Sequence, residues 1–234
     1  MKRKSFILSR FFLLGFVFVL CSCVSQKPHF EKALESEVYT SVNILFYEGE
    51  ITQGKNEVLF KLFNSNDNIG MLEINSEGGD VFASMELGNW IIANNLDVKI
   101  GALCASSCAN YIFTAGNKKI LQEHSLLLWH GSSFQEGISS LVNSGDEFAN
   151  KWRSQEVEFF EKIGVEHRIS ICGLSQVPIG MTILHNLNIV NLKGYDYSLK
   201  DMRSFGIDNI VISGVNWLGT MNHSFKGVFR ASYC

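Results

Sequence analysis

A chain of 234 residues that is 46% apolar can bury one sizeable core, and its formal net charge of -3 and pI near 6.1 make it mildly acidic. Beyond the first ten residues the lysines and arginines are scattered and form no basic stripe, which argues against a nucleic-acid partner. With two prolines and no internal repeat, linker or low-complexity run, the sequence predicts a single compact domain.

Residues 1–22 combine a basic head with an apolar run and predict an export signal. The run Phe11–Leu20 is shorter than a bilayer-spanning helix needs. The signal ends in Leu-Cys-Ser-Cys at residues 20–23, which resembles the bacterial lipobox, where cleavage before a cysteine leaves its sulfur to carry diacylglycerol. Cys23 is then the first mature residue, and the protein is lipid-anchored on the periplasmic face of a bacterial membrane. An uncleaved anchor or a simple secretory signal is the alternative, and either also exports the domain.

Residues 23–40 are polar and charged with little periodicity, and we expect them to form a flexible tether between the lipid and the folded part. The folded part is predicted to be one domain over residues 41–212. Residues 213–234 show no clear pattern and are assigned to a C-terminal tail. The expected organisation is therefore a signal, a tether, one domain and a tail.

Strand and helix patterns alternate through residues 41–212. The predicted strands are Ser41–Ile51, Met71–Asn75, Asp97–Leu103, one or two within Lys118–His130, and a last one ending at Ile212. The predicted helices are Asn56–Asn64, one capped by Asp80, one after Ser107, a helical region over Gly137–Gly164, and short ones at Glu166–Cys172 and after Ser198. Thr182–Leu192 is irregular apolar sequence. This order predicts the α/β fold class.

The region Gly137–Gly164 carries an aromatic face that is too rich for a solvated helix. Its members are Phe148, Trp152, Phe159, Phe160 and Ile163. Such a face must be covered by something. We expect it to pack against the core of the domain, with a contact between subunits as the alternative.

Two turns at the ends of predicted strands are candidates for chemistry. Ser-Glu-Gly-Gly at residues 76–79 precedes a helix, and paired glycines there let backbone N–H groups approach a ligand oxygen closely. Ser107 stands in a cluster of small residues between a strand and an apolar helix, which is how a serine nucleophile is commonly presented. By itself this cluster also fits a tightly packed junction between two elements.

Four cysteines remain in the mature domain, at positions 104, 108, 172 and 234, and an oxidising compartment lets them pair in three ways. The spacing of Cys104 and Cys108 allows a disulfide if the first ends a strand and the second opens a helix. Reduced, buried cysteines beside the nucleophile are the alternative. No histidine pair lies at ligand spacing beside them, so neither a metal nor a cofactor is predicted.

Three motifs in register carry a resemblance to a known family: Leu72–Gly79, Ala105–Gly116 and Leu128–His130. Together they resemble the Clp protease proteolytic subunit, of the ClpP/crotonase superfamily, and the Cys-Ala-Ser-Ser-Cys variant further resembles its exported relatives. The resemblance implies a spiral single domain of repeated strand-strand-helix units. It also implies Ser107 as the nucleophile, His130 as its base, and the N–H groups of Gly79 and Cys108 as the oxyanion hole.

The sequence departs from the family pattern at the acidic member of the triad. The resemblance leaves Gly194 where the aspartate that orients the histidine should be. Asp196 is our candidate for this role, with Asp201 and Glu166 behind it, and a simple turn residue is the alternative for Asp196. Glu77 also replaces the proline of the family's glycine turn, and no sequence resembling the loops that dock an unfoldase is identifiable.

These features predict an exported, membrane-anchored serine peptidase or hydrolase that forms an acyl-enzyme on peptide or protein substrates without an ATPase partner. The alternative is a non-catalytic binding or scaffold lipoprotein on the same fold. Two other classes fit less well: a thioester enzyme of the crotonase type, and a Ser–Lys dyad using Lys118 or Lys119. The predicted partners are the substrate, the membrane through the N-terminal lipid, and further copies in a homo-oligomer, with no nucleic acid.

Overall fold

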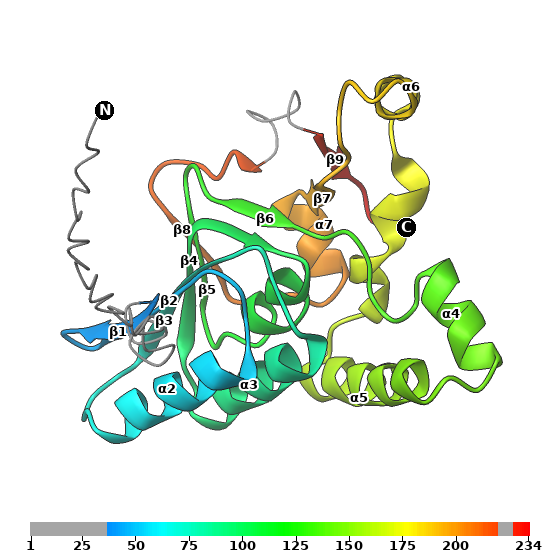
Figure 1. Ribbon diagram of the computed structural model, residues 1–234. Helices are drawn as coiled ribbons and strands as arrows, with labels where there is room; N and C mark the ends of the chain where they lie inside the picture. The colour runs from blue at the N-terminus through cyan, green and yellow to red at the C-terminus, as the bar shows by residue number, and fades with distance from the viewer. Residues whose placement is uncertain (1–36, 220–226) are drawn as a thin grey trace, which may run out of the picture.

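The computed structural model describes residues 37–219 and 227–234 of the chain (Figure 1). The export signal, the lipobox and Cys23 lie outside these ranges, so their assignment stays a prediction. Within the two described ranges, no helix is long and apolar enough to cross a membrane.

Strands and helices alternate along most of the described chain (Figure 1). The strands are β1 (Val38–Ser41), β2 (Ile44–Glu48), β3 (Met71–Ser76), β4 (Asp97–Ala105), β5 (Lys119–Gln122), β6 (Leu126–Leu128), β7 (Gly194–Tyr197), β8 (Ile210–Ser213) and β9 (Val228–Ala231). The α-helices are α2 (Gln53–Asn64), α3 (Val81–Ala93), α4 (Glu136–Asn143), α5 (Glu147–Ile163), α6 (Ile179–Asn186) and α7 (Leu199–Ser204). A π-helix, η1 (Cys108–Phe113), and two 3₁₀ helices, η2 (His167–Ser170) and η3 (Cys172–Gln176), complete the set.

The main sheet runs in the order β1-β2-β3-β4-β5-β8 and is parallel except at β1. Strand β4 changes partner along its length: its first half pairs with β5 and its last three residues pair with β6. A second, two-stranded parallel sheet joins β7 to β9. The chain is therefore a single mixed α/β domain, as the alternation of strand and helix patterns predicts.

Helices α2, α3 and α5 lie along one side of the main sheet, at the bottom of the view in Figure 1. Asp80 caps α3 as predicted, because its side chain accepts a hydrogen bond from the backbone N–H of Ala83 at 2.8 Å. The aromatic face of α5 packs on the core, where Phe159 and Phe160 are buried. Core packing is thus confirmed for these two residues, whereas Phe148 at the start of the helix is exposed.

The structure corrects the predicted ends of the domain and one internal segment. Val38 is buried and pairs with Tyr47, so the sheet begins inside the stretch assigned to the tether. The stretch assigned to a tail contains β9, which pairs with β7. Part of the segment described as irregular, Thr182–Leu192, belongs to helix α6. The first two differences arise from pairing between strands, which local sequence patterns do not reveal.

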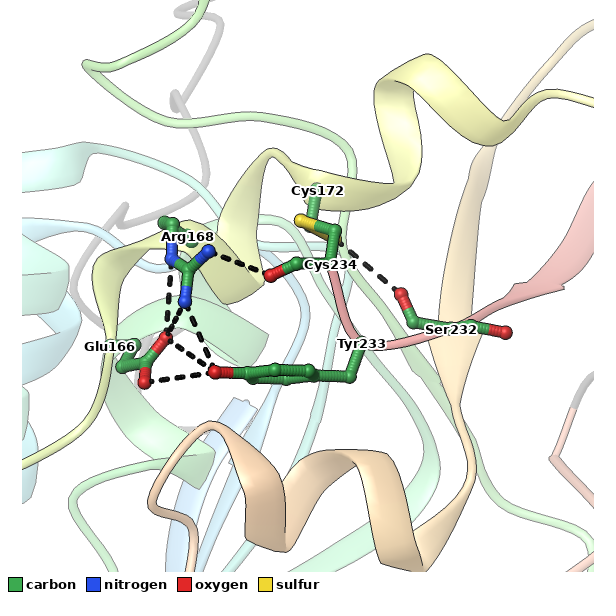
Figure 2. Close-up of polar contacts among 6 residues, drawn as sticks. All are labelled: Glu166, Arg168, Cys172, Ser232, Tyr233 and Cys234. Atoms are coloured by element: carbon green, nitrogen blue, oxygen red, sulfur yellow. Dashed lines mark hydrogen bonds and ion pairs between the residues drawn. A yellow bond between two sulfur atoms is a disulfide. The ribbon is translucent and has the colours of Figure 1, made fainter.

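The last residues of the chain are fastened to the helical turns η2 and η3 (Figure 2). A disulfide joins Cys172 to Cys234. Arg168 donates a hydrogen bond to the backbone oxygen of Cys234 at 2.7 Å and also pairs with Glu166, and the Tyr233 hydroxyl donates to the Glu166 carboxylate at 3.2 Å. The C-terminus is therefore an integral part of the fold.

Candidate active site

Ser107 lies directly between β4 and η1, where the chain turns sharply from strand to helix. Ser106 has a φ of +58°, a backbone conformation that favours glycine and that a serine adopts at a cost in strain. A disulfide joins Cys104, near the end of β4, to Cys108, the first residue of η1, with a Cα–Cα distance of 5.3 Å. The disulfide therefore closes the tight turn that contains Ser106 and Ser107.

The glycine turn after β3 lies against the Ser107 hydroxyl. The backbone N–H of Gly79 donates a hydrogen bond to Ser107 Oγ at 2.9 Å. Gly78 has a φ of +101°, and a Cβ there would lie 2.8 Å from the carbonyl oxygen of Ala105 and 3.0 Å from Ser107 Oγ. Only glycine fits this position, because any side chain would displace the serine turn. The two motifs, distant in sequence, thus form one structure.

His130 reaches the same edge of the sheet through the pairing of β4 with β6. Ala105 is the register partner of Leu128, and the N–H of Ser106 donates to the oxygen of Leu128 at 2.9 Å. Ser107 and His130 each lie two residues beyond this pair. Because β4 and β6 are parallel, both residues emerge at the same end of neighbouring strands.

An amide side chain fixes the segment that follows His130. Asn110, on η1 one turn after Ser107, is buried and donates a hydrogen bond from Nδ2 to the oxygen of Gly131 at 3.0 Å. This bond ties the chain next to the histidine to the helix that begins beside the serine. Asn110 is not among the site residues predicted from the sequence, although a polar residue inside an apolar helical run is a visible signal.

Two pockets flank His130, which is itself exposed. The first, of about 360 Å³, is lined by Glu77, Leu103, Ala105, Leu128, His130 and Lys193. The second, of about 340 Å³, is also lined by His130 and Lys193, and its other lining residues are mainly apolar: Leu174, Val177, Leu192, Gly194, Tyr195 and Phe229. His130 therefore lines two cavities, as a residue of a binding site would.

The Ser107 hydroxyl is buried and is directed toward the glycine turn. Residue Ser107 is 2% exposed. Its Oγ lies 3.0 Å from Ser84 Oγ and 3.2 Å from the carbonyl oxygen of Gly79. Across the described residues its hydrogen bonds are to Gly79 and Ser84, with none to His130.

The two predicted oxyanion donors are backbone groups next to the serine turn. The Gly79 N–H already points at Ser107 Oγ. Cys108 is the first residue of η1, and the N–H groups of a helix's first turn have no acceptor within the helix. Both donors are backbone groups fixed by the disulfide and the glycine turn. Their role toward an oxygen that develops negative charge near the serine stays a prediction.

The acidic residue predicted to orient His130 is held by an arginine. Asp196, on β7, is fully buried and accepts hydrogen bonds from Arg230 Nε at 3.0 Å and from Arg230 Nη2 at 2.8 Å. Gly194 is the residue beside the histidine, since a Cβ built on it would lie 3.5 Å from the Cβ of His130. The role of Asp196 toward His130 therefore stays a prediction.

The two other candidates for the acidic member of the triad, Asp201 and Glu166, also have hydrogen-bond or ion-pair partners. Asp201 accepts hydrogen bonds from the Ser198 hydroxyl and the Tyr233 backbone, and Glu166 pairs with Arg168.

Within the ranges that the structure describes, no group of three or more histidine, cysteine, aspartate or glutamate side chains could hold a metal ion.

A buried carboxylate that was not predicted from the sequence supports the loop after His130. Glu156, on α5, accepts hydrogen bonds from the Tyr111 hydroxyl at 2.7 Å and from the Ser133 N–H at 2.9 Å. Trp152 Nε1 donates to the same Tyr111 hydroxyl at 2.9 Å. An acidic residue on the aromatic face of α5 was the available signal. Burial raises the pKa of Glu156 above its ordinary value of 4.5.

This raised pKa gives a measurable pH dependence. Between pH 4.5 and the folded-state pKa, the folded protein holds a proton that the unfolded chain has lost. The stability contributed by Glu156 is therefore complete below pH 4.5 and is lost as the pH rises through the folded pKa. We expect Glu156→Gln to remove this part of the slope in the free energy of unfolding, measured by urea denaturation across pH. Glu158→Gln, on the exposed side of α5, should keep the wild-type slope, and equal slopes for all three proteins would contradict the raised pKa.

The likeness to known proteins is found among solved structures. No protein-family model matches the chain. No curated protein matches it either. Among solved structures, a mutant ClpP1 from Listeria monocytogenes is similar to it, with 21% sequence identity, a TM-score of 0.36, and coverage of 52% of this chain and 77% of that chain.

Proposed function

We propose that the protein is a serine hydrolase in which Ser107 is the nucleophile and His130 is the general base. The observation that carries this proposal is the convergence at one sheet edge: Ser107 follows β4, His130 follows its parallel neighbour β6, and the Gly79 N–H lies 2.9 Å from Ser107 Oγ. A nucleophile, a base and an oxyanion donor are the parts that acyl transfer requires.

The proposed reaction proceeds through an acyl-enzyme. Ser107 Oγ attacks the substrate carbonyl carbon while His130 accepts the hydroxyl proton, and the N–H groups of Gly79 and Cys108 stabilise the resulting oxyanion. Collapse of this intermediate breaks the bond to the leaving group, which takes the proton from His130. Water then hydrolyses the ester by the reverse sequence of proton transfers. A peptide is the substrate class that the sequence motifs favour.

We further propose that the enzyme acts outside the cytosol on short or unfolded chains, without an ATPase partner. The basic and apolar N-terminal segment and the lipobox-like sequence ending in Cys23 support export and lipid anchoring on the periplasmic face. The disulfides Cys104–Cys108 and Cys172–Cys234 are compatible with an oxidising compartment. Self-association into a homo-oligomer is part of the same proposal.

A non-catalytic scaffold on this fold is the second candidate. Two observations favour it: the Ser107 hydroxyl is buried and bonded to the glycine turn, and Gly194 supplies no carboxylate beside His130. In this case the serine would serve only to lock β3, β4 and η1 together.

A fluorophosphonate probe applied to the purified full chain separates the two candidates. We expect covalent labelling of the wild type, because the probe reacts with an activated serine. His130→Ala should label at least about a hundredfold more slowly, since the base is lost, whereas His124→Ala, also exposed, should label normally. A wild-type protein that never labels supports the scaffold.

A further inference from the structure

Asn110 is a buried polar residue inside the apolar helix η1, and only one half of its side-chain amide has a partner. The residue is 2% exposed, and its Nδ2 donates a hydrogen bond to the backbone oxygen of Gly131 at 3.0 Å. Its Oδ1 is buried and has no hydrogen-bond partner among the residues that the structure describes. A buried carbonyl oxygen without a donor lowers stability, so stability alone does not explain an amide at this position.

The same residue connects the two segments that carry the proposed nucleophile and base. The backbone N–H of Asn110 donates a hydrogen bond to the oxygen of Ser106 at 2.9 Å, one residue before Ser107. Its side chain binds the oxygen of Gly131, one residue after His130. The serine turn and the histidine segment are therefore joined through one buried side chain.

The backbone next to His130 is held on both sides, and Gly131 is its most flexible point. Before the histidine, two backbone hydrogen bonds join Trp129 to Tyr195, at 2.8 and 2.9 Å. Beyond it, the N–H of Ser133 donates to a buried carboxylate on α5 at 2.9 Å. Gly131 lies between these two fixed points with a φ of +145°, and a glycine has more backbone freedom than any other residue. The amide on η1 restrains the chain at this glycine.

The imidazole of His130 depends on this backbone for its direction. It is exposed and has no hydrogen-bond partner among the described residues. We propose that Asn110 is a positioning residue for His130: by fixing the carbonyl group of Gly131, it holds the imidazole where it accepts the proton of Ser107. The inference rests on the roles proposed above for Ser107 and His130. A displacement of a catalytic group by about 1 Å costs on the order of 100-fold in rate, so a buried restraint of this kind has a large effect.

A double-mutant cycle on the rate of fluorophosphonate labelling of the full chain tests the proposal. Asn110→Leu keeps the branched shape of the side chain but removes its donor, and it should slow labelling by about tenfold or more. In the His130→Ala background the same substitution should slow labelling by less than about twofold, because the base that it positions is gone. Gln122→Ala is the matched control: it removes another side-chain amide that donates to a backbone oxygen, that of Ile100 at 2.9 Å, and it should label at the wild-type rate.

Amide hydrogen exchange of the peptide that covers residues 129–134 gives a second readout, which is independent of the chemistry. Exchange in this peptide should be faster in Asn110→Leu than in the wild type or in Gln122→Ala, because the segment opens more often. Urea denaturation establishes that each variant is folded. Asn110→Ala repeats both measurements with a smaller side chain if leucine prevents folding.

Unchanged labelling of the Asn110 variants would overturn the proposal. So would equal slowing in the wild-type and His130→Ala backgrounds, since Asn110 would then act on the fold or on Ser107 directly. Unchanged exchange of residues 129–134 would contradict it as well. A wild-type protein that never labels contradicts the proposed hydrolase instead, and the exchange measurement then still decides whether Asn110 holds the segment that carries His130.

Discussion

Replacing Ser107 with alanine is expected to abolish fluorophosphonate labelling and to lower substrate turnover by on the order of 10⁴-fold or more, because the attacking oxygen is removed. The fold should survive. The lost hydroxyl leaves the Gly79 N–H without its acceptor, which costs about 1–3 kcal/mol in the free energy of unfolding. Labelling and urea denaturation of the same preparation measure both effects.

Ser125→Ala is the matched control for this variant. Ser125 is also buried, and its hydroxyl donates a hydrogen bond to the oxygen of Gln122 at 2.8 Å, away from the candidate site. It should lose a comparable amount of stability and keep full labelling. Turnover that persists in Ser107→Ala, with the fold intact, would refute the serine mechanism.

Arg230→Met is expected to destabilise the protein by about 3 kcal/mol, the lower end of the cost of breaking a buried ion pair. Asp196 is fully buried, and Arg230 donates two hydrogen bonds to its carboxylate. Methionine preserves most of the side-chain volume but leaves that carboxylate without its guanidinium. Denaturation by urea at neutral pH measures the loss.

Arg203→Met provides the comparison, since Arg203 is exposed at the end of α7 and should change stability by less than about 0.5 kcal/mol. Equal stability of the Arg230 and Arg203 variants would show that other groups stabilise the Asp196 carboxylate. A large loss of stability for Arg230→Met alone would show that the Asp196–Arg230 ion pair stabilises the pairing of β7 with β9.

Local sequence patterns were sufficient to predict β3, the start of α3 and the segment around Ser107. The apolar run of β3, the Asp80 cap and the small residues around Ser107 each act over a few neighbouring residues, so their patterns predict the elements directly. The spacing of Cys104 and Cys108 likewise allows the disulfide that the structure contains. The convergence of Ser107 with Gly79 required three motifs in register, because it depends on strand pairing.

Features that depend on distant partners could not be predicted in this way. Val38 joins the sheet through the two-residue turn Val42–Asn43, in which Val42 has a φ of +56° and the Asn-Gly or Asp-Gly pair that normally signals such a hairpin is absent. Asp196 meets Arg230 across two strands far apart in the chain. Helix α6 exposes its apolar stripe, so it lacks the alternation with polar residues by which a surface helix is recognised.

Peptide mapping of the fluorophosphonate adduct by mass spectrometry tests the central claim most directly. The probe forms a stable bond to the attacking oxygen, so the modified residue identifies the nucleophile. We expect a single adduct on the peptide that contains Ser107, formed in the wild type and lost in His130→Ala. An adduct on a different residue, or a wild-type protein that remains unmodified under conditions where its fold is intact, would contradict the assignment of Ser107.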